Sequence, residues 1–320
     1  MNSFPIEFSN IGLPGPYIKK GNNEFAMPCP KCGGKDRFVV WTDRPYPNWN
    51  YLCRTCTPDG EWLDDLFPEI KDKNWKISPQ ERAKRAAEYA REREESLKRE
   101  IEKAQLVLKE LQEARSWLRY HEQLDDFAKG LYEQRGIPEF FQEFWKLGYS
   151  ADKLFISDGE EWHTPTLTIP IFEPGWNCIN VRHRLLNPKK LNDKYRPDRS
   201  GLPAALYVAD PDKKIENKTF LVEGEFKAMT TFVTIDDPGM QVIGIPGKNC
   251  KLDLLNKMKN CDPVYICLDP DAKKEAQEIA NIIGRSRSRV VNLPGKIDDM
   301  INEGILDKEK LKHIINTSKN

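Results

Sequence analysis

The feature that most constrains the fold of this chain is a set of two Cys-x-x-Cys pairs near its start. Cys29 and Cys32 form the first pair, Cys53 and Cys56 form the second, and 20 residues separate the two pairs. Two such knuckles place four thiolates around one tetrahedral ion, and a site closed by four cysteines is structural rather than catalytic. The spacing therefore predicts a zinc ribbon built around one Zn²⁺ ion.

The residues around the cysteine pairs predict short strands and little core. Apolar runs occur at 37–41 and 49–52, and the turn-rich segment 42–48 separates them. A small hairpin with so little core needs an additional stabilising link, which a bound metal ion would supply. The remaining cysteines stand singly in apolar surroundings, so we expect them to be ordinary buried thiols: Cys178, Cys250, Cys261 and Cys267.

A long charged helix is expected to follow the ribbon. Ser78, Pro79 and Glu81 have the spacing of a helix start, with a capping box. The stretch that continues to Arg115 lacks glycine and proline. We interpret it as a solvated linker helix, with a coiled-coil seam as the alternative.

Strands and helices alternate from Thr219 onward, which predicts a parallel sheet with helices on its faces. The expected strands are 219–223, 241–245, 264–268 and 289–293. In such sheets, ligands bind at the carboxyl ends of the strands. Short helices are expected at 117–149, and strands and loops at 164–210.

Carboxylates follow several of these strands. Glu223 ends the first strand, Asp269 and Asp271 follow the third, and Asp298 follows the fourth. Like charges brought together in this way need a cation among them, and oxygen ligands suit Mg²⁺ or Mn²⁺. The alternative is that these acids cap helices at strand–helix turns.

A local basic strip precedes the acidic residues. The whole chain carries 50 Lys and Arg against 50 Asp and Glu, so net charge gives no argument for nucleic acid. Residues 182–199 are different, because seven positive side chains face only Asp193 and Asp198. Such a strip is expected to bind phosphate. Its basic members are Arg182, Arg184, Lys189, Lys190, Lys194, Arg196 and Arg199.

The first cysteine pair lies in the run CPKCGGKDRF, which resembles the zinc-ribbon module of bacteriophage and plasmid primases. The resemblance implies that this module helps to recognise a DNA template. Lys35, Arg37 and Arg54 would then contact phosphate. Phe38 and Trp41 would either stack on a base or form the core of the hairpin.

The later motifs resemble the Toprim domain of bacterial-type primases, topoisomerases and some nucleases. Glu223-Gly224 matches its first motif, and Asp269 with Asp271 matches its Asp-x-Asp motif. The resemblance implies catalytic carboxylates that bind Mg²⁺ or Mn²⁺. Lys227 and Lys296 stand where the family often has acids, so we expect either fewer metals or a direct contact of a lysine with a nucleotide phosphate.

Residues 168–196 resemble the N-terminal subdomain of the primase core. The resemblance implies that basic residues of this segment hold the template and the nucleotide, and it points to four of them: Arg182, Arg184, Lys194 and Arg196.

These features together predict an α/β multi-domain primase that makes short RNA primers on single-stranded DNA from nucleoside triphosphates. The expected domains are a ribbon (1–70), a linker (71–118), a core subdomain (119–215), a Toprim domain (216–304) and a tail (305–320). The alternatives are a Toprim-type nuclease and a non-catalytic DNA-binding replication accessory protein.

The absence of two sequence features bears on the expected partners and location of the protein. No GxxxxGK[ST] loop occurs in the sequence, so a helicase would be either a separate primosome partner or absent. No apolar run of about 18 residues is present, so no membrane span is expected. We expect a protein of the bacterial or phage-infected host cytoplasm.

Overall fold

The structure is a computed structural model of the 320-residue chain. It describes residues 8, 13, 15–21, 23–42, 49–62, 79–157, 159–189, 193–216, 218–247 and 250–318. The chain divides into two compact units, Met1–Glu94 and Glu95–Asn320. Three features expected from the sequence lie outside the described residues: Ser78, Lys190 and most of the turn at 42–48.

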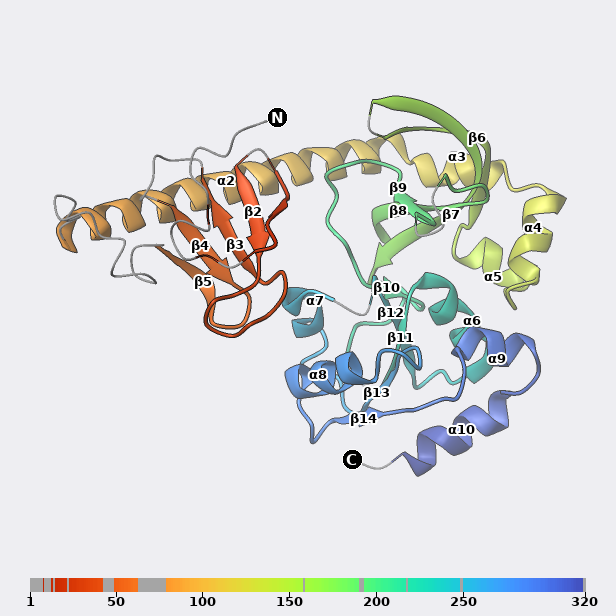
Figure 1. The fold of residues 1–320 in the computed structure, drawn as a ribbon. Coiled ribbons are helices and arrows are strands. Elements are labelled where there is room, and N and C mark those ends of the chain that lie inside the picture. The colour runs from red at the N-terminus through yellow and green to blue at the C-terminus, as the bar shows by residue number, and fades with distance from the viewer. Residues whose placement is uncertain are drawn as a thin grey trace. The chain divides into compact units, whose positions relative to one another are not determined.

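The first unit is built on a five-stranded antiparallel sheet (Figure 1). It is larger than the expected hairpin, because two strands precede the first expected run and one follows the second. Phe38 and Tyr51 stack at its centre with ring centroids 4.7 Å apart. The strands are β1 (Ile18–Lys19), β2 (Glu24–Met27), β3 (Phe38–Trp41), β4 (Asn50–Cys53) and β5 (Thr57–Trp62).

The charged helix is present as α2 (Pro79–Ala114). Its end belongs to the second unit, where Leu111 is fully buried against Phe172, Cys178 and Val181. Leu97 remains exposed. The helix is thus anchored at its C-terminal end, where apolar residues return at helical spacing.

The second unit continues with three short helices and a four-stranded antiparallel sheet. Tyr132 ties them together, because its buried hydroxyl donates to the carbonyl oxygens of Gly148 and Thr168, each at 3.0 Å. The sheet order is β6-β7-β8-β9. The elements are α3 (Ser116–Glu122), α4 (Asp126–Glu133), α5 (Glu139–Phe144), β6 (Gly148–Ser157), β7 (Glu160–Glu173), β8 (Asn177–Leu185) and β9 (Tyr195–Pro197).

A second five-stranded sheet follows, in the order β10-β12-β11-β13-β14. Its strands are β10 (Tyr207–Val208), β11 (Thr219–Glu223), β12 (Gln241–Ile245), β13 (Val264–Cys267) and β14 (Ser288–Val290). Four of these strands pair in parallel, as expected, and β10 pairs antiparallel with β12. The last two strands end earlier than expected.

Helices cover both faces of this sheet, which explains its continuous apolar strands. Phe220 and Val222 belong to a buried cluster with residues of α6, and Leu221 belongs to a second cluster with residues of α8. The two helices lie on opposite faces of the sheet (Figure 1). The helices of this part are α6 (Glu225–Ile235), α7 (Leu252–Asn256), α8 (Lys273–Ile283), α9 (Ile297–Asn302) and α10 (Lys308–Thr317).

One hydrophobic core joins the two sheets of the second unit. Ile169 of the antiparallel sheet, Phe220 of the mixed sheet and Leu311 of α10 belong to the same buried cluster. The expected α/β multi-domain class is therefore confirmed. None of the described helices is both long enough and apolar enough to cross a membrane.

Candidate zinc site and acidic cleft

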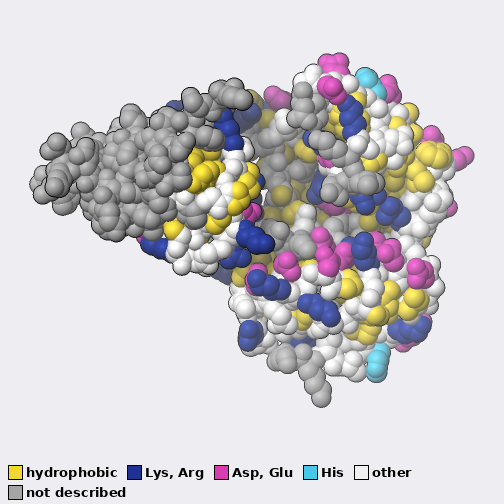
Figure 2. Space-filling model, viewed as in Figure 1, with side chains coloured by type: hydrophobic (Ala, Val, Ile, Leu, Met, Phe, Trp, Pro, Cys, Tyr) yellow, Lys and Arg dark blue, Asp and Glu magenta, His cyan; other side chains and the backbone are white. Residues whose placement is uncertain are grey.

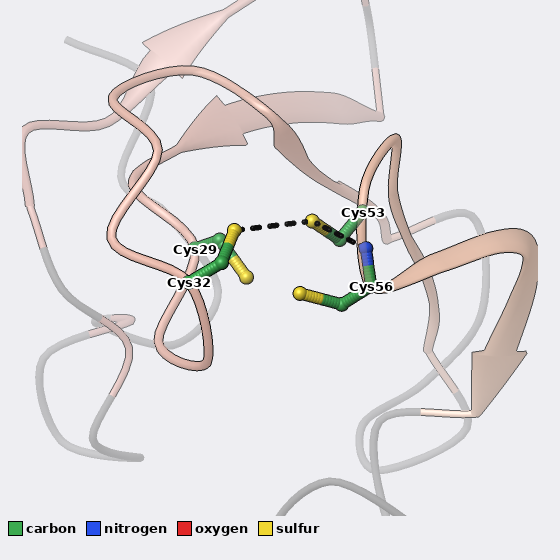
Figure 3. A group of neighbouring side chains, drawn as sticks. All are labelled: Cys29, Cys32, Cys53 and Cys56. Atoms are coloured by element: carbon green, nitrogen blue, oxygen red, sulfur yellow. Dashed lines mark hydrogen bonds between the residues drawn. The ribbon is translucent and has the colours of Figure 1, made fainter.

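The four cysteines of the ribbon converge on one point (Figure 3). Their sulfur atoms all lie within 4.8 Å of one another, and the Sγ atoms of Cys32 and Cys53 are 3.7 Å apart. A tetrahedron with Zn–S bonds of about 2.3 Å has edges of roughly 3.8 Å. The cluster is therefore a structural Zn²⁺ site with four thiolate ligands.

Local backbone geometry prepares one of the ligands for metal binding. Burial alone would raise the pKa of the Cys53 thiol, but hydrogen bonds from the backbone N–H groups of Cys56 and Thr55, and from the thiols of Cys29 and Cys32, lower the pKa to about 6. The Cys56 N–H donates to the Cys53 sulfur at 3.4 Å. Zinc binds the thiolate form, so this turn favours the ligand state of Cys53.

The ribbon side chains that were expected to contact DNA differ in exposure. Lys35, Arg37 and Arg54 are exposed, and Arg37 Nη1 donates to Thr55 Oγ1 at 3.1 Å. Phe38 is 1% exposed and belongs to the core of the ribbon, so it is not available to stack on a base.

The second unit contains a cleft of about 250 Å³ at the carboxyl end of β11. The strand ends at Glu223, and Gly224 follows with a φ of 88°, a left-handed conformation that glycine adopts without strain. This turn starts α6, so Glu223 and Lys227 both line the cleft. Its other lining residues are Arg135, Arg182, Tyr195, Gly224, Glu225, Phe226, Pro246 and Asp298.

Lys227 pairs with Asp269 at the edge of the sheet. Its Nζ atom lies 2.7 Å from Oδ1 and 2.9 Å from Oδ2 of Asp269. The side chains are 14% and 15% exposed, so both charges are largely removed from water. The charge of Lys227 thus offsets the charge of Asp269, one of the predicted metal ligands.

Asp298 lies in the first turn of α9 and faces the same cleft. Burial raises the pKa of its carboxyl group, while the charge of Lys227 acts in the opposite direction. Its Oδ1 atom is buried without a hydrogen-bond partner. An unpartnered buried carboxylate oxygen beside Glu223 fits a hard divalent cation.

The remaining predicted acid stands apart. Asp271 is exposed and does not line the cleft. Within the described part of the chain, the cysteines are the only group of three or more metal-binding side chains close enough to share one ion. The structure thus brings Glu223 and Asp298 to one cleft, pairs Asp269 with Lys227, and does not include Asp271 among the residues that line the cleft.

Arg182 connects the basic strip to the cleft. Its Nη1 atom lies 2.9 Å from Oε1 of Glu225, which is 4% exposed. The guanidinium groups of Arg182 and Arg184 each lie 5.0 Å from the ring centre of Tyr195. Stacking on an aromatic face fixes the direction of an arginine while its N–H groups stay available to an anion.

Other members of the basic strip have acidic partners or face solvent. Lys194 is exposed. Arg196 pairs with Asp193, and Arg199 Nη1 lies 3.0 Å from Glu110 Oε2. The excess positive charge is therefore smaller at the surface than a count along the sequence indicates. Blue and magenta side chains alternate on the visible face of this unit (Figure 2).

Three polar residues that line the cleft were not assigned a role from the sequence. Arg135 lies 4.4 Å from the ring centre of Phe226, and Tyr195 and Glu225 hold Arg182. Arg135 stands 88 residues before Glu223. The only sequence signal that could have pointed to Arg135 is its position next to Gly136, where a helix is expected to break. Glu225 is a second acid directly after the Glu-Gly pair, which was a usable signal.

Residues 25–62 match the family model described as the zinc-binding domain of primase-helicase. A search of curated protein sequences found no match. Among solved structures, the Aquifex aeolicus primase with its zinc-binding and RNA polymerase domains is similar, with a TM-score of 0.51 and 18% identity. That alignment covers 94% of this chain and 80% of the other.

Two further solved structures resemble about two thirds of the chain. The DnaG primase catalytic domain bound to single-stranded DNA has a TM-score of 0.52 and 15% identity, covering 67% of this chain and 82% of that chain. A Pseudomonas aeruginosa DNA primase domain has a TM-score of 0.52 and 13% identity, covering 66% and 78%. These likenesses confirm the primase-type fold that the sequence motifs predict.

Proposed function

We propose that this chain is a DNA primase, a nucleotidyltransferase that makes short RNA primers on single-stranded DNA during replication. The observation that carries the proposal is the composition of the cleft. Glu223 and Asp298 face Lys227, Arg182 and Arg135 there. Carboxylates for a metal and cations for phosphate are the two groups that nucleotide transfer requires.

The acidic edge of the sheet is the proposed catalytic centre. Glu223, Asp269, Asp271 and Asp298 are the proposed carboxylates. Bound Mg²⁺ or Mn²⁺ would polarise the α-phosphate of a nucleoside triphosphate and neutralise charge that develops there. The residues of the chain would hold the triphosphate in line with the attacking 3′-hydroxyl, and positioning of this kind contributes much of the rate.

The basic residues are the proposed binding surface for the nucleotide and the template. Arg182 and Arg184 present guanidinium groups that their contacts with Tyr195 hold in place. Lys194, which is exposed, and Arg196 extend this surface along the strip. Lys227 lies in the cleft itself, within reach of a phosphate bound there.

The ribbon is the proposed module for choosing a start site on the template. Lys35 and Arg37 lie on its exposed surface, next to the first zinc knuckle. The matching family model is described as part of a primase-helicase. We therefore propose a separate replicative helicase as the partner of this chain.

Primer synthesis tests the proposal. The zinc-loaded chain is incubated with mixed single-stranded DNAs, labelled ribonucleotides and Mg²⁺ or Mn²⁺, beside the variants Glu223→Gln and Glu303→Gln. Glu303 is an exposed acid just after α9 and serves as the matched control. We expect short template-dependent products from the wild type and the control, and loss of at least roughly a hundredfold with Glu223→Gln.

Other outcomes identify the alternatives. Cleavage of the template without synthesis would assign the acidic edge to a Toprim-type nuclease. DNA binding with neither reaction would assign the chain to a replication accessory role. Equal synthesis by the wild type and Glu223→Gln would remove Glu223 from the catalytic centre.

A further inference from the structure

We propose that a groove between α3, α4 and α5 is a docking site for a segment of a partner protein that presents an arginine beside a bulky apolar side chain. The three helices lie beside one another in the second unit, and residues of each line the groove (Figure 1). Its volume is about 550 Å³, which is usual for a binding site. None of its lining residues lines the acidic cleft, so an occupant here would be a partner additional to DNA and nucleotides.

An exposed phenylalanine provides the apolar part of the groove. Phe140 of α5 is 72% exposed, more than any other large apolar side chain in the part of the chain that the structure describes. Its ring meets that of Phe141 edge-on, with ring centroids 5.2 Å apart, and Phe141 packs on the main core of the unit. Leu124, which is partly buried, also lines the groove. Covering Phe140 would remove apolar surface from water, which favours an occupant with a bulky apolar side chain.

Gln142 adds an unsatisfied hydrogen-bond acceptor to the groove. It lines the groove although it is 0% exposed. Its Nε2 atom donates to the carbonyl oxygens of Ile137 at 2.9 Å and of Lys129 at 3.2 Å, which fixes the side chain. Its Oε1 atom is buried and has no hydrogen-bond partner in the described structure. A buried polar atom without a partner is costly, and lining side chains commonly rotate on binding, so an N–H donor of an occupant would find an acceptor here.

Acidic side chains surround the groove. Residues 119–146 carry six Asp and Glu against four Lys and Arg, and one of the four, Arg135, lines the acidic cleft instead. A hydrogen bond with Glu139 raises the pKa of Lys129, which lines the groove, and the charges of neighbouring acids act in the same direction. A negative potential of this kind attracts cations and repels the phosphates of nucleic acid. The expected occupant is therefore a protein segment with positive charge.

The two acids that line the groove remain available to such a segment. Glu139 and Glu143 each pair with a lysine, but their side chains are 66% and 63% exposed. Exposed ion pairs contribute little to stability, so an incoming cation can replace these lysines. Arginine fits best, because its planar guanidinium pairs with a carboxylate and also stacks on an aromatic ring such as Phe140.

Fluorescence anisotropy of a peptide of sequence GRLRG, blocked at both ends and carrying an uncharged fluorophore, tests the inference. The peptide is titrated with the zinc-loaded full chain as wild type, Phe140→Ala and Phe127→Ala. We expect saturable binding to the wild type with a Kd below roughly 1 mM, and binding about tenfold weaker to Phe140→Ala. Phe127 of α4 is 59% exposed and does not line the groove, so Phe127→Ala should bind as the wild type does.

A second set of variants tests the charges and leaves the apolar surface unaltered. The peptide GELEG, which carries acids in place of both arginines, should not bind. The double variant Glu139→Gln/Glu143→Gln should weaken the binding of GRLRG by roughly three- to tenfold. Glu122 is an exposed acid of α3 that does not line the groove, so Glu122→Gln should leave the affinity unchanged.

The contrary outcomes are specific. No saturable binding to the wild type, or equal binding to the wild type and a folded Phe140→Ala chain, would overturn the inference. A dimer that forms with rising concentration and is abolished by Phe140→Ala would assign the groove to a second copy of the chain, which would overturn it too. These outcomes leave the primase proposal standing, because no residue of the groove belongs to the acidic cleft.

Discussion

The guanidinium of Arg182 lies 2.9 Å from the carboxylate of Glu225, and this ion pair joins β8 to the first turn of α6. The carboxylate side chain is 5% exposed and that of the arginine 24%. The pair links the antiparallel sheet, which carries the basic strip, to the helix that carries Lys227. It therefore fixes the two sides of the cleft relative to one another.

Loss of Arg182 should destabilise the chain more than loss of the charge on Glu225. Arg182→Met leaves a buried carboxylate unpaired, which should cost about 3 kcal/mol. Glu225→Gln keeps a hydrogen-bonding side chain and should cost about 1 kcal/mol. Urea denaturation followed by circular dichroism gives both values.

The double variant Arg182→Met/Glu225→Gln is the control for this pair. It should be more stable than Arg182→Met alone, because it has no buried carboxylate without a positively charged partner. Strictly additive losses would contradict a direct interaction between the two side chains.

Metal removal should unfold the ribbon and spare the second unit. A thin core with a four-cysteine site depends on its ion for folding. We expect atomic emission to find one zinc per wild-type chain. The Cys53→Ser chain should have lost this zinc, and its ribbon should no longer be folded. Cys250→Ser, a change outside the cluster, should retain the metal. A Cys53→Ser chain that still held one zinc would refute the four-cysteine site.

His183 should make the stability of the second unit fall below neutral pH. Burial lowers the pKa of its imidazole, and this outweighs the opposing effect of Asp198, which accepts from Nε2 at 3.1 Å. The unfolded chain, with a His pKa of about 6.5, binds a proton that the folded chain does not. The contribution of His183 to the free energy of unfolding should therefore be fully present above pH ~6.5. It should decline as the pH falls from there to the pKa of the folded state, by at most about 1.4 kcal/mol per pH unit.

Comparison with His183→Gln isolates this effect. The variant should show a shallower loss of stability between about pH 6.5 and 5, whatever its absolute stability. Denaturation midpoints at a series of pH values provide the two slopes. Equal slopes would show that another group is responsible for the acid sensitivity.

The exposed cations of the ribbon should contribute to DNA binding through phosphate contacts. Lys35→Ala and Arg37→Ala should each weaken binding to single-stranded DNA, and each should reduce the salt dependence by about 0.7 in the log–log slope. Fluorescence anisotropy at several salt concentrations measures both. Lys312→Ala, a change on α10, should leave the slope unaltered. If Lys35→Ala and Arg37→Ala also left the salt dependence of binding unchanged, the ribbon surface would not contact the DNA.

The zinc site and the sheet order of this chain differ in how far the sequence could predict them. The four cysteines are close in sequence, and their spacing alone specifies the metal geometry. The strands 219–223 and 241–245 were predicted to the residue, because buried parallel strands are continuous apolar runs. Strand β10 has only two residues, and its antiparallel pairing with β12 depends on contacts across the fold.

The residues of the cleft were predicted only in part. The carboxyl ends of parallel strands meet at one edge, so Glu223 and Asp298 could be placed together. The partners of charged side chains could not be predicted, since Arg182 and Glu225 are 43 residues apart in the sequence. The same holds for Lys227 and Asp269, whose pairing alters the interpretation of the acidic motif.

The most direct test of the central claim is the sequence of the RNA made by the zinc-loaded chain on single-stranded DNA of known sequence. The account predicts short ribonucleotide products complementary to the template, made by the wild type and absent with Glu223→Gln. Labelled RNA that is not complementary to the template, or no RNA from a chain that binds both Mn²⁺ and DNA, would contradict it.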